Sequence, residues 1–174
     1  YNEYEAKIGE TYYKTLKDAL KDAHNDDTVI LLKDIVIKDS DLSNDYYVYS
    51  IGCTLDGNNH DILLDTSPEN LRYFVYFLYG SIVNAHFDLE GNGGIAVYGD
   101  NAHFINTDLY ASELHYEGND GAFVTYAQGN IYFDTCSFDG KITGTGSPTD
   151  YGAVFVGYVF GNAELLSFVN CKNY

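Results

Sequence analysis

The sequence contains no Trp, no Met and only 2 Pro among its 174 residues. Because even an initiating Met is missing, we expect a processed segment of a longer protein. Positive charge is also scarce: 9 Lys and Arg stand against 26 Asp and Glu, for a net charge of -17. Nucleic acid and anionic membrane surfaces repel such a chain, so neither is expected as a partner. No apolar run approaches the ~18–20 residues that span a bilayer, and no membrane insertion is expected.

Metal-binding patterns are missing as well. The 3 Cys include no CxxC pair, which argues against a zinc site. Cys136 and Cys171 fall at matched places in a repeat described below, and we expect small buried thiols there rather than a disulfide. The 5 His are scattered without ligand spacing, so no metal site and no cofactor are predicted.

The residues that are abundant favour β structure. The chain has 18 Tyr, 10 Phe and 17 Gly, and 45% of its residues are hydrophobic. Aromatic residues are enriched in strands, and glycine serves tight turns. This length and composition predict one all-β domain that covers residues 1–174.

One helix is predicted near the start, over residues 13–25. Thr15 and Asp18 form the beginning of a capping box. An apolar stripe at helical spacing follows, made of Leu16, Ala19, Leu20 and Ala23. We expect this short helix to cover one end of a stack of strands formed by residues 28–174.

Short strand patterns then recur along the chain. Four segments align loosely: 82–87, 104–109, 133–138 and 168–171. Their third positions are Asn84, Asn106, Thr135 and Asn170. Three short strands in each unit, with unit lengths that tolerate insertions, predict a parallel β-helix, a solenoid of stacked coils. In such a stack Asn84, Asn106 and Asn170 would form a structural ladder of side-chain amides.

A β-sandwich or jelly roll is the alternative fold. Turn-like segments at 57–58 and 91–94 would suit antiparallel hairpins in that architecture. The two folds differ in one respect that coordinates reveal directly, because a sandwich would place Asn84, Asn106 and Asn170 far apart.

Several segments resemble bacterial extracellular right-handed parallel β-helix proteins of the pectate-lyase-like superfamily. Residues 15–20 and 27–34 are similar to the capping helix and first coil of those proteins, and 54–62 to their "LDGNGHTI" turn. Residues 152–158 and 168–173 resemble the GLUG-type repeats of large bacterial surface proteins. The resemblance implies a right-handed solenoid. Since the superfamily includes lyases, hydrolases, adhesins and tailspikes, it leaves the activity open.

Candidate catalytic and calcium-binding residues have simpler explanations. A lyase would need basic residues, and the single Arg, Arg72, falls in a predicted loop. A glycoside hydrolase would need converging carboxylates. The available acids in the repeat are Asp88, Glu90, Asp108, Glu117, Asp134 and Asp139, which also suit a solvated surface. The oxygen-rich segment 56–61 lacks EF-hand spacing, and turn chemistry accounts for it.

The excess of tyrosine points to a surface. One strand in each unit is apolar on both faces, and strands alternate their faces, so one aromatic set should point outward. We predict that Tyr76, Ile95, Phe123 and Phe155 form this ligand-binding set. A neighbouring domain, a second copy, a glycan, or the loops at 41–45 and 144–150 would cover such a face.

These observations together predict a non-catalytic extracellular module that acts in adhesion or in glycan or protein recognition. We expect it to be secreted or displayed on a bacterial cell surface, with a host or bacterial glycan or protein as its partner. A polysaccharide-active glycoside hydrolase or lyase on the same scaffold is the alternative.

Overall fold

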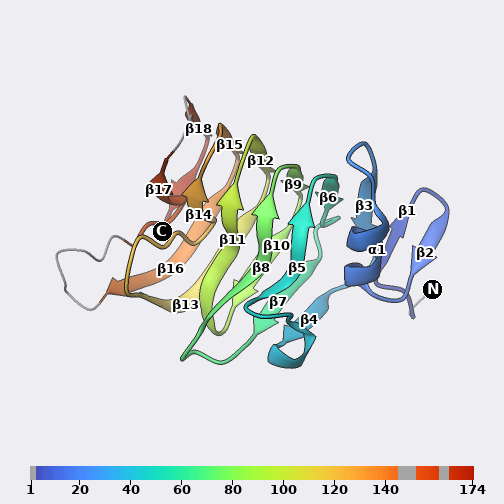
Figure 1. Cartoon of the computed structure of the whole chain (residues 1–174), viewed down its shortest axis with the longest axis horizontal. Coiled ribbons are helices and arrows are strands. Elements are labelled where there is room, and N and C mark those ends of the chain that lie inside the picture. Colours follow the sequence, from blue (N-terminus) through green and yellow to red (C-terminus); the bar gives the residue numbers. More distant parts are fainter. Residues whose placement is uncertain (1–2, 145–151, 161–164) are drawn as a thin grey trace.

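A computed structural model describes residues 3–144, 152–160 and 165–174. These residues are mostly β and form three sheets, largely parallel, and one α-helix (Figure 1). Sheet A contains β1 (Ala6–Ile8), β2 (Thr11–Tyr13), β3 (Thr28–Leu31), β6 (Thr54–Asp56), β9 (Ser81–Val83), β12 (Ala102–Ile105), β15 (Ile131–Asp134) and β18 (Leu166–Val169). Sheet B contains β4 (Ile35–Lys38), β7 (Asp61–Asp65), β10 (His86–Leu89), β13 (Asp108–Tyr116), β16 (Ser137–Gly144) and β19 (Lys172–Asn173). Sheet C contains β5 (Tyr46–Ile51), β8 (Leu71–Leu78), β11 (Asn92–Gly99), β14 (Val124–Ala127) and β17 (Val156–Val159).

The chain visits the three sheets in turn. From β3 onward, each strand pairs in parallel with the strand three places later in the chain. The only antiparallel strand pairs in the described residues are β1 with β2 and β1 with β3. A sandwich is built from antiparallel pairs, so this alternative is wrong.

The core lies between the sheets and is built from rows, by which we mean residues in register on successive strands. Sheet A contributes a row that includes Phe104, Phe133 and Phe168. The rings of Phe104 and Phe133 are parallel within 6°, with centroids 5.1 Å apart, and those of Phe133 and Phe168 repeat this stack. Sheet C faces them with Phe123, whose ring meets Phe104 edge to face. In-register strands therefore place identical rings directly over one another.

The corner between sheets A and B has the same backbone geometry in successive units. Asn84, Asn106, Thr135 and Asn170 all have positive φ, between 47° and 55°. Asparagine tolerates this left-handed conformation better than most residues. Asn106 Nδ2 donates to Asn84 Oδ1 at 2.9 Å, and Asn84 Nδ2 donates to Asp56 Oδ1 at 3.2 Å. The hydrogen-bonded ladder thus runs from Asp56 to Asn106, and Thr135 bonds its own neighbour Asp134 instead.

After three of the four corners, the next residue bonds the preceding unit through its side chain; Ala85, after Asn84, is the exception. Thr107 Oγ1 donates to the carbonyl of Ile82, and the Cys136 thiol donates to that of Phe104. All 3 cysteines of the chain are free. Burial raises the pKa of the Cys136 thiol to about 12. Cys136 thus serves as a small buried residue that satisfies a backbone carbonyl.

The N-terminal end is covered by the helix and a hairpin (Figure 1). Helix α1 spans Leu16–Asp22, which is shorter than the predicted 13–25, because Tyr13 belongs to β2 and the backbone at Ala23 is already extended. Thr15 caps the helix as predicted, by accepting a hydrogen bond from the Asp18 N–H at 3.1 Å. A 3-10 turn, η1 (Asp39–Asp41), follows β4.

Candidate functional site

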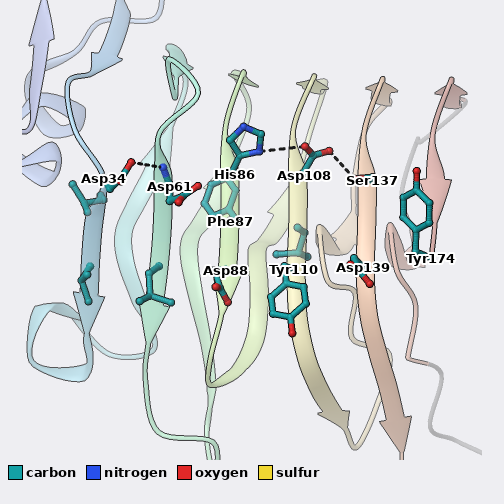
Figure 2. A pocket seen from close by; sticks show the side chains of 14 residues that line it. Asp34, Asp61, His86, Phe87, Asp88, Asp108, Tyr110, Ser137, Asp139 and Tyr174 are labelled. Carbon is teal, nitrogen blue, oxygen red and sulfur yellow. Dashed lines mark hydrogen bonds and ion pairs between the residues drawn. The ribbon is translucent and has the colours of Figure 1, made fainter.

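A groove of about 560 Å³ runs along the outer face of sheet B, across strands that follow one another in the sheet (Figure 2). The groove is lined by Asp34, Ile35, Val36, Asp61, Leu63, His86, Phe87, Asp88, Asp108, Leu109, Tyr110, Ser137, Asp139 and Tyr174. The volume lies within the range typical of ligand pockets, about 300–1,000 Å³. We therefore treat it as the candidate site.

Strand alternation divides the outward residues of the groove into two rows. The first row contains Asp34, Asp61, His86, Asp108 and Ser137. The second row lies two residues further along each strand and contains Val36, Leu63, Asp88, Tyr110, Asp139 and Tyr174. The residues between them, such as Phe87 and Leu109, point into the core and are almost completely buried. Side chains on one face of a strand recur at every second residue, which is why the two rows share this surface.

The first row is linked by hydrogen bonds and ion pairs. Asp108 accepts from the Ser137 hydroxyl at 2.6 Å and lies 3.2 Å from His86 Nδ1 (Figure 2). Asp34 accepts from the Asp61 N–H at 3.0 Å, and its Oδ1 lies 3.1 Å from His60 Nδ1. These contacts, the Asp61 N–H first and His60 second, hold the pKa of Asp34 below its ordinary value. Most carboxylates of this row are thus already engaged within the protein.

The second row differs because its acids have no partner among the described residues. Asp88 Oδ1 is inaccessible to solvent and has no hydrogen-bond partner among the described residues. Burial raises the pKa of Asp88, and the neighbouring carboxylates of Glu90 and Asp61 add to the effect. Tyr110, which follows Asp88 in the row, is 48% exposed. A buried oxygen without a donor costs free energy.

The charge of the groove is of one sign. Five aspartates line it, and no Lys or Arg does. On the same sheet, Lys172 lies in register with Ser137 at the C-terminal end of the first row, whereas Lys38 pairs with Asp65 and Lys141 with Glu113. Anionic ligands such as polyuronates are therefore disfavoured, and neutral or cationic ligands are favoured.

The predicted ligand-binding set does not form an outward face. Ile95 and Phe123 are fully buried, and Phe155 is partly buried against the same core. Tyr76 lies in a different row, because the register places Phe74 beside Ile95 and Phe77 beside Tyr98. The prediction failed because a bend precedes β14 and allows consecutive residues, Phe123 among them, to face the interior.

The outer face of sheet C carries tyrosines instead. Tyr49, Tyr76, Tyr98 and Tyr126 follow one another across the sheet, with neighbouring ring centroids 5.2–5.4 Å apart. Burial and the neighbouring Tyr98 raise the pKa of Tyr76. Each ring covers part of the next one. Of the two loops that we expected to cover this face, residues 145–150 lie outside the described part of the chain.

Other predicted candidates lie apart from one another. Of the six acids of the repeat, Asp88, Asp108 and Asp139 line the groove, whereas Asp134 belongs to β15 and Glu117 lines a separate pocket. His86 lies in the groove, but His103 stacks on Tyr132 of sheet A, with ring centroids 4.4 Å apart. Only three of the six acids thus meet at one surface.

Two predictions about single segments also have clear outcomes. Arg72 is not in a loop: it lies in β8, where its Nε donates to Asp39 at 3.0 Å and its Nη1 pairs with Asp45. In the oxygen-rich segment, Asp56 Oδ1 accepts from the Asn58 N–H at 2.8 Å as well as from the Asn84 amide. These hydrogen bonds stabilise the backbone turn of the segment.

Several groove residues were not singled out from the sequence as site candidates, namely Asp34, Tyr110, Ser137 and Tyr174, and Asp61 was considered only as part of a calcium-binding turn. The sequence does contain a pattern that identifies these residues. The residues two and four places after each corner are His86 and Asp88, Asp108 and Tyr110, Ser137 and Asp139, and Lys172 and Tyr174. Extending the asparagine alignment by these offsets would have found both rows, because strand β10 and its equivalents begin at the corner.

Comparison of the chain with protein-family models, with curated proteins and with solved structures finds no match in any of the three. Within residues 3–144, 152–160 and 165–174, no helix has both the length and the apolar character needed to cross a membrane. Over the same residues, no three His, Cys, Asp or Glu side chains are grouped so that they could hold a metal ion.

Proposed function

We propose that this chain is an extracellular, right-handed parallel β-helix module that recognises a glycan through the groove on sheet B. The order of the strands supports the solenoid, since the chain passes through sheets A, B and C repeatedly and pairs in parallel throughout the stack. We also propose that the protein is secreted or displayed on a surface and that its role is adhesive and non-catalytic, as the sequence resemblance implies.

The composition of the groove carries the proposal. Carboxylates accept hydrogen bonds from sugar hydroxyls, and an exposed aromatic ring packs against the apolar face of a sugar. The groove offers both, in Asp88 and Asp139 on either side of Tyr110, over a floor that includes Leu63. Its length across successive strands suits an extended oligosaccharide better than a compact ligand.

Binding by a Tyr110→Ala variant tests this function. A glycan array first identifies a ligand for the unmodified chain, and calorimetry then compares variants. We expect Tyr110→Ala to weaken binding about tenfold, since a lost aromatic contact is worth roughly 0.5–1.5 kcal/mol beyond its buried area. Tyr49→Ala is the matched control, because Tyr49 is 63% exposed but lies on sheet C. Equal losses in both variants, or no bound glycan on the array, would contradict the proposal.

A second candidate function, glycoside hydrolysis, is favoured by one observation. The raised pKa of Asp88 is the property required of a general acid. Asp88 and Asp108 lie one strand and two residues apart, which places their α-carbons about 8 Å apart. Inverting glycosidases separate their two carboxyl groups by about 6.5–9.5 Å. A lyase is less well supported, because Arg72 is already paired with two aspartates.

An activity screen separates the two candidates. The unmodified chain and an Asp88→Asn variant are incubated with neutral and amino-sugar oligosaccharides, and products are resolved by chromatography. Turnover that disappears in Asp88→Asn would establish the hydrolase. Binding without turnover would support glycan recognition as the function.

A further inference from the structure

We propose that the groove selects a glycan that carries free amines, namely an extended β-1,4-linked amino-sugar polymer; this inference rests on the proposed glycan-binding function. The second row supports this selectivity, because carboxylates and phenols alternate along it: Asp88, Tyr110, Asp139 and Tyr174. Tyr110 and Tyr174 are 48% and 69% exposed. Figure 2 shows Asp88, Tyr110 and Asp139 on successive strands of the groove.

The acids of this row are available to a ligand. Asp88 Oδ1 is inaccessible to solvent, so Asp88 Oδ2 is the oxygen that a ligand can meet. Among the residues that the structure describes, no hydrogen bond or ion pair joins the Asp88 or Asp139 carboxylate to another residue. A sugar hydroxyl would satisfy the hydrogen bond alone. An ammonium group would supply the hydrogen bonds and the positive charge together, which makes it the better complement for a carboxylate.

The phenol between the two acids also favours a cation. An ammonium group held near Asp88 or Asp139 lies beside the ring of Tyr110, whose π-face attracts positive charge. Five aspartates and no Lys or Arg line the groove, and the lysine in register with it, Lys172, lies beside Ser137 in the first row and not in the second row. The same alternation would add little binding affinity for a ligand that has hydroxyl groups only.

The spacing of the row distinguishes a glycan from a cationic peptide. Asp88 and Asp139 are in register two strands apart, and strands lie about 4.8 Å apart, so the acids repeat at about 9.6 Å. In an extended β-1,4-linked chain, alternate sugars present their amines on the same side, with a repeat close to this length. In an extended peptide, side chains on the same side recur every ~6.8 Å and fall out of register with the acids.

Calorimetry with the full chain tests the inference. The probes are a glucosamine hexamer with free amines, its fully N-acetylated counterpart, a neutral glucose hexamer and oligolysine of equal charge. We expect the free-amine hexamer to bind at least about tenfold more tightly than the acetylated and neutral ones, and more tightly than oligolysine. The Asp88→Asn, Asp139→Asn double variant should lose this preference while it retains weak binding of all three sugars.

A charge-matched control excludes general attraction to an acidic surface. Glu10→Gln with Asp26→Asn removes the same two charges from exposed positions near the helix end of the molecule. If this control weakens binding as much as the groove variant does, the attraction is nonspecific and the inference is overturned. Thermal unfolding monitored by circular dichroism checks that all variants remain folded.

The outcomes also separate this inference from the proposed function. Equal binding of free-amine, acetylated and neutral hexamers would overturn the amine selectivity and leave glycan recognition intact. Tighter binding of oligolysine than of the free-amine hexamer would overturn it in favour of a peptide ligand. Absence of binding by every sugar would overturn the glycan-binding function itself.

Discussion

Asn106 lies where the chain turns from sheet A to sheet B, and two separate properties of its side chain matter there. Its backbone has φ of 47°, a left-handed conformation that costs most L-residues roughly 1–2 kcal/mol. Its amide also donates to Asn84 at 2.9 Å in a partly buried position. Local conformation and contact between units therefore select the same residue type.

Two substitutions at this position separate the properties. Asn106→Ala loses both the hydrogen bond and the tolerance of positive φ, and we expect it to lower the free energy of unfolding by about 2 kcal/mol. Asn106→Gly retains the backbone conformation and should cost about 1 kcal/mol. Urea unfolding measures both. Equal losses would show that the backbone conformation contributes nothing.

Thr135 provides the matched comparison, because it occupies the equivalent corner with φ of 55° and its hydroxyl donates to the neighbouring Asp134 instead of to another corner. A β-branched residue is strained in this region. Thr135→Gly should therefore leave stability unchanged or raise it, in contrast to Asn106→Gly.

At the scale of an element, helix α1 shows how a short segment can protect the end of a stack. Leu16 and Ala19 are fully buried and Leu20 is 5% exposed, although the helix has only 7 residues. A helix this short is not stable by itself, so its packing against the strands maintains it. It covers apolar core, while β1 pairs with the edge of β3.

Truncating the buried face of the helix tests this role. Leu16→Ala should lower the free energy of unfolding by about 2–4 kcal/mol, as large-to-small substitutions in cores do. Lys21→Ala, on the exposed side of the same helix, should change it by less than about 0.5 kcal/mol. Chemical unfolding gives both values. A Leu16→Ala variant as stable as Lys21→Ala would show that the helix does not support the stack.

At the scale of the whole molecule, the net charge of -17 opposes the compact state through self-repulsion. Individual carboxyls change the stability of the fold with pH in opposite directions, because folding raises some of their pKa values and lowers others. The folded-state pKa of Asp120 is raised by burial, and Asp88 behaves similarly. Hydrogen bonds from Ser67 lower the pKa of Asp39, and those from Thr143 lower the pKa of Glu113.

The sign of each contribution follows from linkage. A carboxyl with a raised folded-state pKa stabilises the fold at low pH, and this stability is lost as pH rises through its titration range. A carboxyl with a lowered pKa stabilises the fold above its ordinary value, and that stability is lost as pH falls through the lowered pKa. Both effects, together with self-repulsion, place the pH at which the fold is most stable on the acidic side of neutral.

We therefore expect the thermal midpoint to be higher near about pH 5.5 than near about pH 8, with added salt raising it more at the higher pH. Asp120→Asn should raise the midpoint at the higher pH and reduce this difference, because Tyr73 can still donate to the amide oxygen. Asp26→Asn removes the same charge from an exposed position and should have a smaller effect. A midpoint that rises steadily with pH would contradict the prediction.

The sequence by itself determined the features that depend on residue type and local spacing. Strand and turn composition predicted a mostly β chain, the Leu16 stripe predicted the helix, and the sum of charges disfavoured anionic partners. The corner asparagines could also be identified, because they recur at the same position of the aligned segments. Three acids of the groove, Asp88, Asp108 and Asp139, could be named as candidates, but not as neighbours.

Only the tertiary structure decided which residues share a row. The segments between equivalent strands differ in length, so hydrogen-bond register, not the similarity of letters, sets which side chains meet. This is why Tyr76 was grouped with Ile95 although Phe74 lies beside Ile95, and why the alternation of Asp88, Tyr110 and Asp139 was not foreseen. A one-residue change of register exchanges the buried and exposed faces of a strand, so a surface site depends on the pairing of the strands.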